Sequence, residues 1–229
     1  MSSPPRRLPA IRLNALATAV PDHDIHKAFI DWATPRLADA RIRALFARMA
    51  ARSGIDHRWS VLPPTPTGGS PVAAGGFYDV PGLPPTSARM AAYADHAPDL
   101  AMQAIAALGA AFDPARITHI VVASCTGFVA PGIDQILARR LKLAPTVERV
   151  LIGFMGCYAG VTALRTARHI VRSQSEAVVL VVSVELSTLH LSLADQPEPL
   201  LAMLQFSDGA AAGIVSAAPG TTTGPPFGT

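Results

Sequence analysis

The stretch that decides the fold is RVLIGFMGCYAGVTALRTARHIVRSQSEAVVLVVSVE, residues 149–185. It holds a short apolar run at 149–154, a glycine-flanked cysteine, a helical pattern to about Ser173 and a longer apolar run at 177–185. Continuous apolar runs of this length are typical of strands buried on both faces. The stretch therefore predicts a strand–helix–strand unit of an α/β fold, with 177–185 as a central strand.

The flanking sequence repeats this alternation of strand-like and helix-like segments. Further strands are predicted at 10–20, which we expect to be buried, at 117–124, and at 210–217 after a turn at 207–209. Helices are predicted at 35–53, at 87–112 and at 132–143. Thr34 and Pro35 fit the start of the first helix and Gly54 its end, whereas Pro98 requires a kink or break in the second. Residues 62–86 are rich in Pro and Gly and predict a loop.

The composition narrows the possible classes of protein. Of the 229 residues, 50% are hydrophobic and only 15% are charged, which supplies a sizeable core. No apolar run approaches the roughly 20 residues of a membrane span, and no signal peptide is recognisable. Two cysteines cannot form a disulfide framework, no zinc-ligand spacing occurs, and a net charge of +3 is too small to imply nucleic acid. We therefore expect a cytoplasmic protein with no metal, no nucleic-acid partner and no membrane partner.

Cys157 is the strongest candidate for chemistry. It lies where a predicted strand ends and a helix begins, between Gly156 and Gly160, and such nucleophile-bearing turns need glycines because they are crowded. The positive end of the helix dipole favours a thiolate there, and neighbouring backbone N–H groups can stabilise an oxyanion during acyl transfer. From the spacing alone, an inert buried cysteine explains the pattern equally well.

Longer motifs favour the functional interpretation. Five segments carry them: ARMAAYADHAPDLAMQAI at 88–105, ITHIVVASCTGFVAPGID at 117–134, GFMGCYAGVTALRTA at 153–167, VLVVSVELSTLHL at 179–191 and LQFSDGAAAGIVSAA at 204–218. The chain resembles the type III polyketide synthases, the chalcone synthase-like branch of the thiolase superfamily. The resemblance implies the N-terminal half of the thiolase-like αβαβα layered fold and a homodimer. It also implies an acyltransferase that condenses malonyl-CoA with a CoA-linked starter by decarboxylation, with these CoA thioesters as substrates and no cofactor.

The resemblance assigns roles to individual residues of this sequence. Cys157 matches the nucleophile that carries the starter and the growing chain as a thioester. Phe206 matches the gatekeeper phenylalanine between the CoA tunnel and the cavity. The cavity-lining positions fall on Cys125, Thr126, Ser187 and His190, and the dimer-interface turn falls on Ala130 and Pro131. Cys125 is expected to shape the cavity, since nothing around it indicates a second nucleophile.

The helix predicted up to Arg52 tests the CoA expectation independently. At 100° per residue, Arg41, Arg48 and Arg52 form a basic face of this helix. The basic face adjoins an apolar stripe, which consists of Ile42, Leu45, Phe46 and Met49. A solvated basic face explains this pattern by itself. In the family, basic residues here bind CoA phosphates, and Arg48 and Arg52 match two of those positions. The third falls on Leu45, which Arg41 or Arg43 would have to replace.

The resemblance also implies residues that this sequence does not contain. The family's histidine partner of the thiolate and its asparagine are expected well beyond Thr229, and neither His169 nor His190 matches them by motif. We interpret residues 1–218 as the N-terminal thiolase-like domain, 219–229 as an irregular tail and the C-terminal half as absent. This fragment alone is then expected to be inactive. Two alternatives stay open: a β-ketoacyl synthase III-like condensing enzyme that takes acyl-carrier protein, and a non-catalytic remnant that only dimerises or binds CoA.

Overall fold

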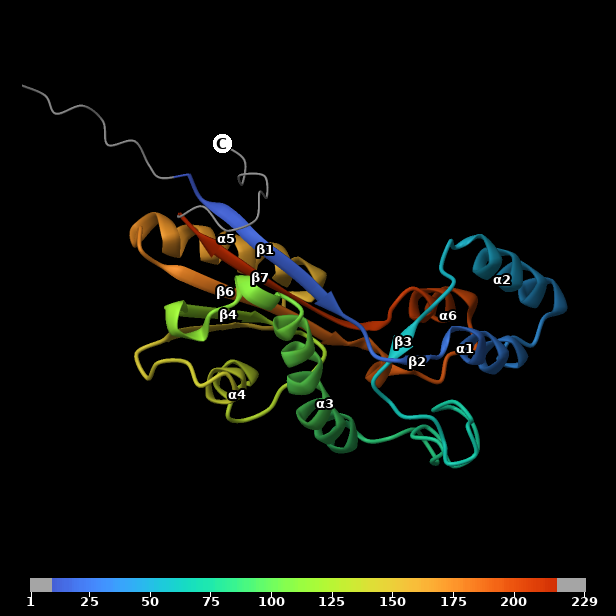
Figure 1. Cartoon of the computed structure of the whole chain (residues 1–229). Helices are drawn as coiled ribbons and strands as arrows, with labels where there is room; N and C mark the ends of the chain where they lie inside the picture. The colour runs from blue at the N-terminus through green and yellow to red at the C-terminus, as the bar shows by residue number, and fades with distance from the viewer. Residues whose placement is uncertain (1–9, 218–229) are drawn as a thin grey trace, which may run out of the picture. The chain divides into compact units, whose positions relative to one another are not determined.

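The computed structural model describes residues 10–217, which fall into two compact units. The first, here called the sheet unit, comprises 10–19, 98–184 and 210–217. The second, the helical unit, comprises 20–97 and 185–209. Figure 1 shows the helices and strands of the chain with their labels. The irregular tail predicted at 219–229 lies outside the described residues.

A five-stranded sheet forms the centre of the sheet unit. Its strands are β1 (Arg12–Ala19), β4 (His119–Ala123), β5 (Glu148–Ile152), β6 (Val178–Leu186) and β7 (Asp208–Ser216). Their order is β1-β7-β6-β4-β5, with β4 parallel to both β5 and β6 and β1 antiparallel to β7. The apolar runs predicted at 117–124 and 177–185 are therefore confirmed as inner strands.

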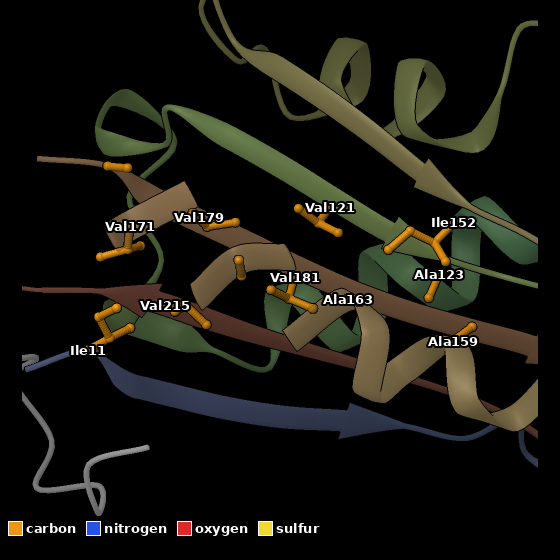
Figure 2. Close-up of a cluster of buried hydrophobic side chains, with 12 residues drawn as sticks. Ile11, Val121, Ala123, Ile152, Ala159, Ala163, Val171, Val179, Val181 and Val215 are labelled. Atoms are coloured by element: carbon orange, nitrogen blue, oxygen red, sulfur yellow. The ribbon is translucent and has the colours of Figure 1, made fainter. Parts of the chain in front are cut away.

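Helices cover both faces of the inner strands. Helix α5 (Ala159–Ser173) places Ala163 and Val171 against Val121 and Val181 of the sheet (Figure 2). Residues of the opposite parity on β4, such as Ile120, are also fully buried. Helix α4 (Ile133–Arg140) lies on the other side of the sheet from α5 (Figure 1). The layered α/β class predicted from the sequence is confirmed.

The helical unit has its own apolar core. It contains α1 (His26–Ala33), α2 (Ala40–Arg52), α6 (Pro197–Leu204) and the two-stranded pair of β2 (His23–Asp24) and β3 (Trp59–Ser60). Phe29, Phe46, Leu200 and Leu204 are buried together between its helices. The short 3-10 helices of the two units are η1 (Thr34–Arg36), η2 (Gly109–Ala111), η3 (Pro114–Arg116), η4 (Gly156–Tyr158) and η5 (Ser187–His190).

The helix predicted at 35–53 is wrong at its start. Thr34–Arg36 form a separate 3-10 turn, and α2 begins at Ala40 because the Asp39 carboxylate caps it by accepting the N–H groups of Arg41 and Ile42. Its end is confirmed: Gly54, with φ of +70°, follows directly after the cap. The predicted apolar stripe is only partly correct. Phe46 is buried, whereas Leu45 and Met49 are 38% and 45% exposed.

Three other predictions need correction. The strand at 10–20 is not buried on both faces, because β1 lies at one edge of the described sheet and Leu16 is 65% exposed. Helix α3 (Thr86–Ala106) ends short of the predicted 112, and it continues through Pro98, so the alternative of a break there is wrong. The turn predicted at 207–209 is absent, since β7 already begins at Asp208. The loop prediction is confirmed up to Pro85, one residue short of its expected end.

Candidate active-site cysteine and its surroundings

Cys157 lies between strand β5 and helix α5, as predicted. The strand ends at Ile152, and Cys157 occupies the single 3-10 turn η4 that leads into α5. The residue is a free cysteine and is exposed among the described residues. The expectation that Cys157 could be a buried cysteine is therefore wrong for this structure.

The sequence suggested that glycine is needed in this turn because the turn is crowded, but the structure gives a different reason. Gly156 adopts a φ of +60°, and a Cβ added there would meet nothing within 4 Å. A Cβ on Gly160 would lie 3.7 Å from the Ser183 hydroxyl oxygen, which is ordinary contact. The left-handed backbone at Gly156, not lack of space, accounts for glycine beside Cys157. Phe154 shares this conformation with a φ of +58° although it has a side chain.

Cys125 contacts the loop that carries Cys157. Its sulfur accepts the Met155 N–H at 3.3 Å and its thiol donates to the Gly156 carbonyl at 3.6 Å. The two cysteines approach the same end of the sheet because β4 and β5 are parallel neighbours, extended by a hydrogen bond from Ser124 N–H to the Ile152 carbonyl. The arrangement agrees with a shaping role for Cys125. Thr126, the next residue, is half-buried.

Sequence analysis missed the arginine that holds Tyr158. The Arg165 guanidinium donates to the Tyr158 hydroxyl, and its central carbon lies 5.6 Å from the ring centroid. The spacing of Tyr158 and Arg165 could have predicted the pair, because residues seven apart on a helix lie on nearly the same face. This pair fixes the side chain next to Cys157 and brings a positive charge to the start of α5.

The predicted dimer turn also belongs to the sheet unit. Ala130 and Pro131 are exposed and joined by a cis peptide bond, just before Gly132 caps α4. Apolar side chains are exposed on the same unit: Phe128 at 64%, Leu151 at 47% and Phe154 at 89%.

The other predicted site residues belong to the helical unit. Ser187 and His190 are the two ends of η5, and Phe206 lies between α6 and β7 with 48% of its surface exposed. Arg48 and Arg52 are exposed on α2. Of the two arginines that could replace the missing third cation, Arg43 donates from its Nη1 to the carbonyls of Leu37 and Ala38 at 2.6 and 2.7 Å, and Arg41 is exposed.

A buried polar network surrounds Asp208. Its carboxylate accepts the N–H and hydroxyl of Thr188 at 2.8 and 2.7 Å and the Val61 N–H at 2.8 Å. Burial raises the pKa of Asp208, although these hydrogen bonds and the charge of Arg58 oppose the rise. Burial also lowers the pKa of the Arg58 guanidinium to about 10. Sequence analysis treated Asp208 as a turn residue and did not single out Arg58.

Neither metal ligation nor membrane insertion is indicated by the described part of the chain. Within residues 10–217 no group of three or more His, Cys, Asp or Glu side chains is arranged to hold a metal ion. In the same range, no helix combines the length and apolar character needed to cross a bilayer.

The structure defines the class of protein: a layered α/β fold with an exposed cysteine in the turn between β5 and α5. Comparisons with known sequences define the family. Residues 8–219 match the family described as chalcone and stilbene synthases, N-terminal domain. This chain therefore belongs to the chalcone and stilbene synthase family, the type III polyketide synthases. The match favours this family over the β-ketoacyl synthase III-like alternative.

Curated relatives include proteins of bacteria, of plants and of Dictyostelium discoideum. The chain is 37% identical over 131 residues to the alpha-pyrone synthesis polyketide synthase-like Pks18 of Mycobacterium tuberculosis. The matched region covers 56% of this chain and 33% of the relative. It is 38% identical over 138 residues to bisdemethoxycurcumin synthase of Oryza sativa subsp. japonica, covering 58% of this chain and 34% of the relative. The matched region thus spans about a third of the length of these relatives.

Solved structures share the thiolase-like fold over nearly the whole chain. The C-terminal type III polyketide synthase domain of Steely1 from Dictyostelium superposes with a TM-score of 0.80 at 27% identity, covering 95% of this chain and 59% of that domain. CsyB in complex with CoA-SH gives a TM-score of 0.77 at 25% identity, with the same coverage.

Proposed function

We propose that this chain is the nucleophile-bearing half of a type III polyketide synthase, with Cys157 as the acyl-accepting thiol. The observation that carries the proposal is the exposed cysteine in the turn between β5 and α5, inside a domain of this family. Its substrates are an acyl-CoA starter and malonyl-CoA, and no further cofactor is proposed. A cytoplasmic location is proposed from the scarcity of cysteine.

The loading step is a thioester exchange. The Cys157 sulfur attacks the thioester carbon of the starter, so that a bond to Cys157 forms and the bond to the CoA sulfur breaks. CoA leaves as a thiolate and takes up the proton that the cysteine released. Extension needs a second step, in which malonyl-CoA loses CO₂ and the resulting enolate requires donors around its oxygen. The family's histidine and asparagine would supply them.

CoA recognition is assigned to the helical unit. Arg48 and Arg52 are exposed on α2, a helix with no acidic residue of its own, and arginine forks suit phosphate. CsyB has been solved with CoA-SH, which supports CoA as the ligand of this fold. Phe206 is proposed as the gatekeeper, and Cys125, Thr126, Ser187 and His190 as cavity residues.

A homodimer is proposed through the sheet unit. Phe128, Leu151 and Phe154 are exposed on the unit that carries the Ala130–Pro131 turn, and a dimer interface there would cover apolar side chains of this kind, which supports the proposal. Sedimentation of the parent chain and of the variant Phe154→Asp tests the proposal. A parent chain that sediments as a monomer at every concentration would contradict it.

The experiment for Cys157 is acyl loading followed by peptide mass analysis. The chain is incubated with an acyl-CoA, and the mass of the transferred acyl group is located on one of the two cysteine peptides. Cys157→Ala is expected to lose the adduct, while the matched control Cys125→Ala keeps it. An adduct that survives Cys157→Ala unchanged would show that the nucleophile is assigned to the wrong residue.

A further inference from the structure

Residues 206–208 are held by one short segment, residues 58–61. The Arg58 Nε–H donates to the Phe206 carbonyl at 2.6 Å. The Ser207 hydroxyl accepts the Trp59 N–H at 2.6 Å and donates to the Trp59 carbonyl at 2.9 Å. The Val61 N–H reaches Asp208, as described above. Each of the residues 206–208 thus has a partner in segment 58–61, and the Phe206 carbonyl is held by a hydrogen bond while its side chain is half exposed.

Arg58 is an unusual residue to find in this place. It is only 4% exposed, its central carbon lies 4.7 Å from the Phe29 ring centroid, and no described residue accepts a hydrogen bond from its Nη1. Burying a guanidinium is costly unless the group makes strong hydrogen bonds. A buried arginine with a short bond to the Phe206 carbonyl is better explained by that bond than by packing, which an apolar side chain would provide without the cost.

The same network reaches the cavity-lining turn. The Asp208 carboxylate accepts hydrogen bonds from both the N–H and the hydroxyl of Thr188. Thr188 lies within η5, between the predicted cavity residues Ser187 and His190. The Ser60 and Thr188 hydroxyls are also 2.7 Å apart. One polar cluster thus ties the main chain at Phe206 to the turn that carries two cavity positions.

We infer that Arg58 is a positioning residue for Phe206 and that its hydrogen bond to the Phe206 carbonyl sets which acyl chains the protein accepts. The inference rests on the proposed gatekeeper function of Phe206. Without the Nε–H donor, the Phe206 backbone relaxes and the ring samples more orientations. Discrimination between long and short acyl chains then weakens, while the thiol chemistry at Cys157 is unaffected.

The test compares Arg58→Lys with Arg36→Lys. Arg36 is a matched control in the same unit, since it also donates to a main-chain carbonyl, that of Trp32, and lies 3.6 Å over an aromatic ring. Acyl transfer to Cys157 is measured with acetyl-, hexanoyl- and palmitoyl-CoA. Arg58→Lys is expected to change the ratio of KM values between the longest and shortest substrate about tenfold, the scale of one charged hydrogen bond, with the rate at saturation nearly unchanged. Arg36→Lys should leave the ratio as in the parent.

A spectroscopic readout separates this inference from the proposed function. Phe206 is replaced by 4-cyanophenylalanine, whose nitrile stretch reports local hydration and disorder. Arg58→Lys is expected to broaden the nitrile band and Arg36→Lys to leave it unchanged. If the parent chain takes no acyl group at Cys157, the proposed function is wrong, and the nitrile band alone decides whether Arg58 positions residue 206.

Two results overturn the inference: a nitrile band that Arg58→Lys does not alter, or an unchanged KM ratio in a chain that does load acyl groups. If Arg58→Lys fails to fold, Ser207 is replaced by its α-hydroxy acid. The resulting ester weakens the Phe206 carbonyl as an acceptor and leaves Arg58 in place. The same broadening is expected there, and an unbroadened band again overturns the inference.

Discussion

The two units of this chain are stabilised by different physics. The twelve residues of the sheet-unit cluster are all aliphatic and pack α5 against parallel strands (Figure 2). The helical unit combines a core of aliphatic residues and two phenylalanines, Phe29 and Phe46, with a buried polar network at Asp208, Arg58 and Thr188. Apolar packing is dense and insensitive to pH, whereas a polar network depends on every partner. The candidate nucleophile is thus carried on the unit with the aliphatic core, and the candidate gate lies next to the buried polar network.

The largest expected effect concerns catalytic competence. Neither unit contains a residue that matches the family's histidine or asparagine, so the 229-residue chain is expected not to produce polyketide from acyl-CoA and malonyl-CoA. Losing members of a catalytic group costs several orders of magnitude in rate. Malonyl-CoA decarboxylation is assayed with the chain alone and with a C-terminal half from a relative added. Turnover by the chain alone, abolished by Cys157→Ala, would mean that one of its seven histidines has taken over the role.

A second prediction addresses the core of the helical unit. Leu204 is 1% exposed, and Leu204→Ala is expected to lower the free energy of unfolding by about 2–5 kcal/mol through the cavity it leaves. The chain's two tryptophans, Trp32 and Trp59, both lie in this unit, so their fluorescence follows its unfolding in denaturant. Ala202→Gly, at an exposed position of the same helix, serves as a milder control. A loss below about 1 kcal/mol for Leu204→Ala would show that the core is not closely packed there.

A third prediction assigns CoA binding to the helical unit. Replacing Arg48 or Arg52 with Ala is expected to weaken CoA binding by about 1.5–3 kcal/mol, the value of a hydrogen bond to a charged group. The loss should shrink as salt rises, because both side chains are exposed. Calorimetry with CoA measures it, and Arg172→Ala on the exposed end of α5 in the sheet unit is the control. Parent-like binding by both variants would favour a merely solvated basic face.

The smallest expected effect is a pH dependence confined to the helical unit. Partial burial raises the pKa of Asp24, but the N–H groups of His26 and Arg58 and the His57 side chain outweigh it and lower the pKa to about 2. Because this pKa is depressed in the folded state, Asp24 stabilises the fold above the ordinary aspartate value of 3.8, and the contribution disappears as pH falls through 2. Asp24→Asn should therefore cost about 1 kcal/mol near pH 7, since the partly exposed group is screened.

The measurement for Asp24 is the unfolding midpoint of parent and variant across pH. The difference between them is expected to narrow as pH drops from 4 towards 2, and a difference constant over that range would contradict the assignment. Asp22→Asn, outside this hydrogen-bonded group, provides the control.

Sequence patterns predicted the elements that packing alone decides. The apolar runs that become β4 and β6 needed no tertiary information, and neither did the glycine after α2. One error, the turn predicted at 207–209, occurs where residues far away in the sequence bind a polar side chain. Asp208 continues into a strand because Val61 and Thr188 satisfy its carboxylate, and nothing near it in sequence shows this. The candidate site follows the same rule. The turn at Cys157 was predictable from local sequence, whereas the Arg58–Phe206 contact joins residues 148 positions apart.

The pairing of β1 with β7 has a consequence for how this chain reaches its fold. Arg12 lies opposite Ser216, and the Asn14 side chain donates to the Ser216 hydroxyl across 202 residues of sequence. During synthesis, β1 leaves the ribosome before β7 and has no pairing partner until nearly all of these residues have followed. Contacts of such sequence separation slow folding, and an unpaired strand with an apolar side chain such as Leu16 invites association with other chains meanwhile. Strand β1 is thus made well before it can pair, and chaperone demand should be greatest before β7 emerges.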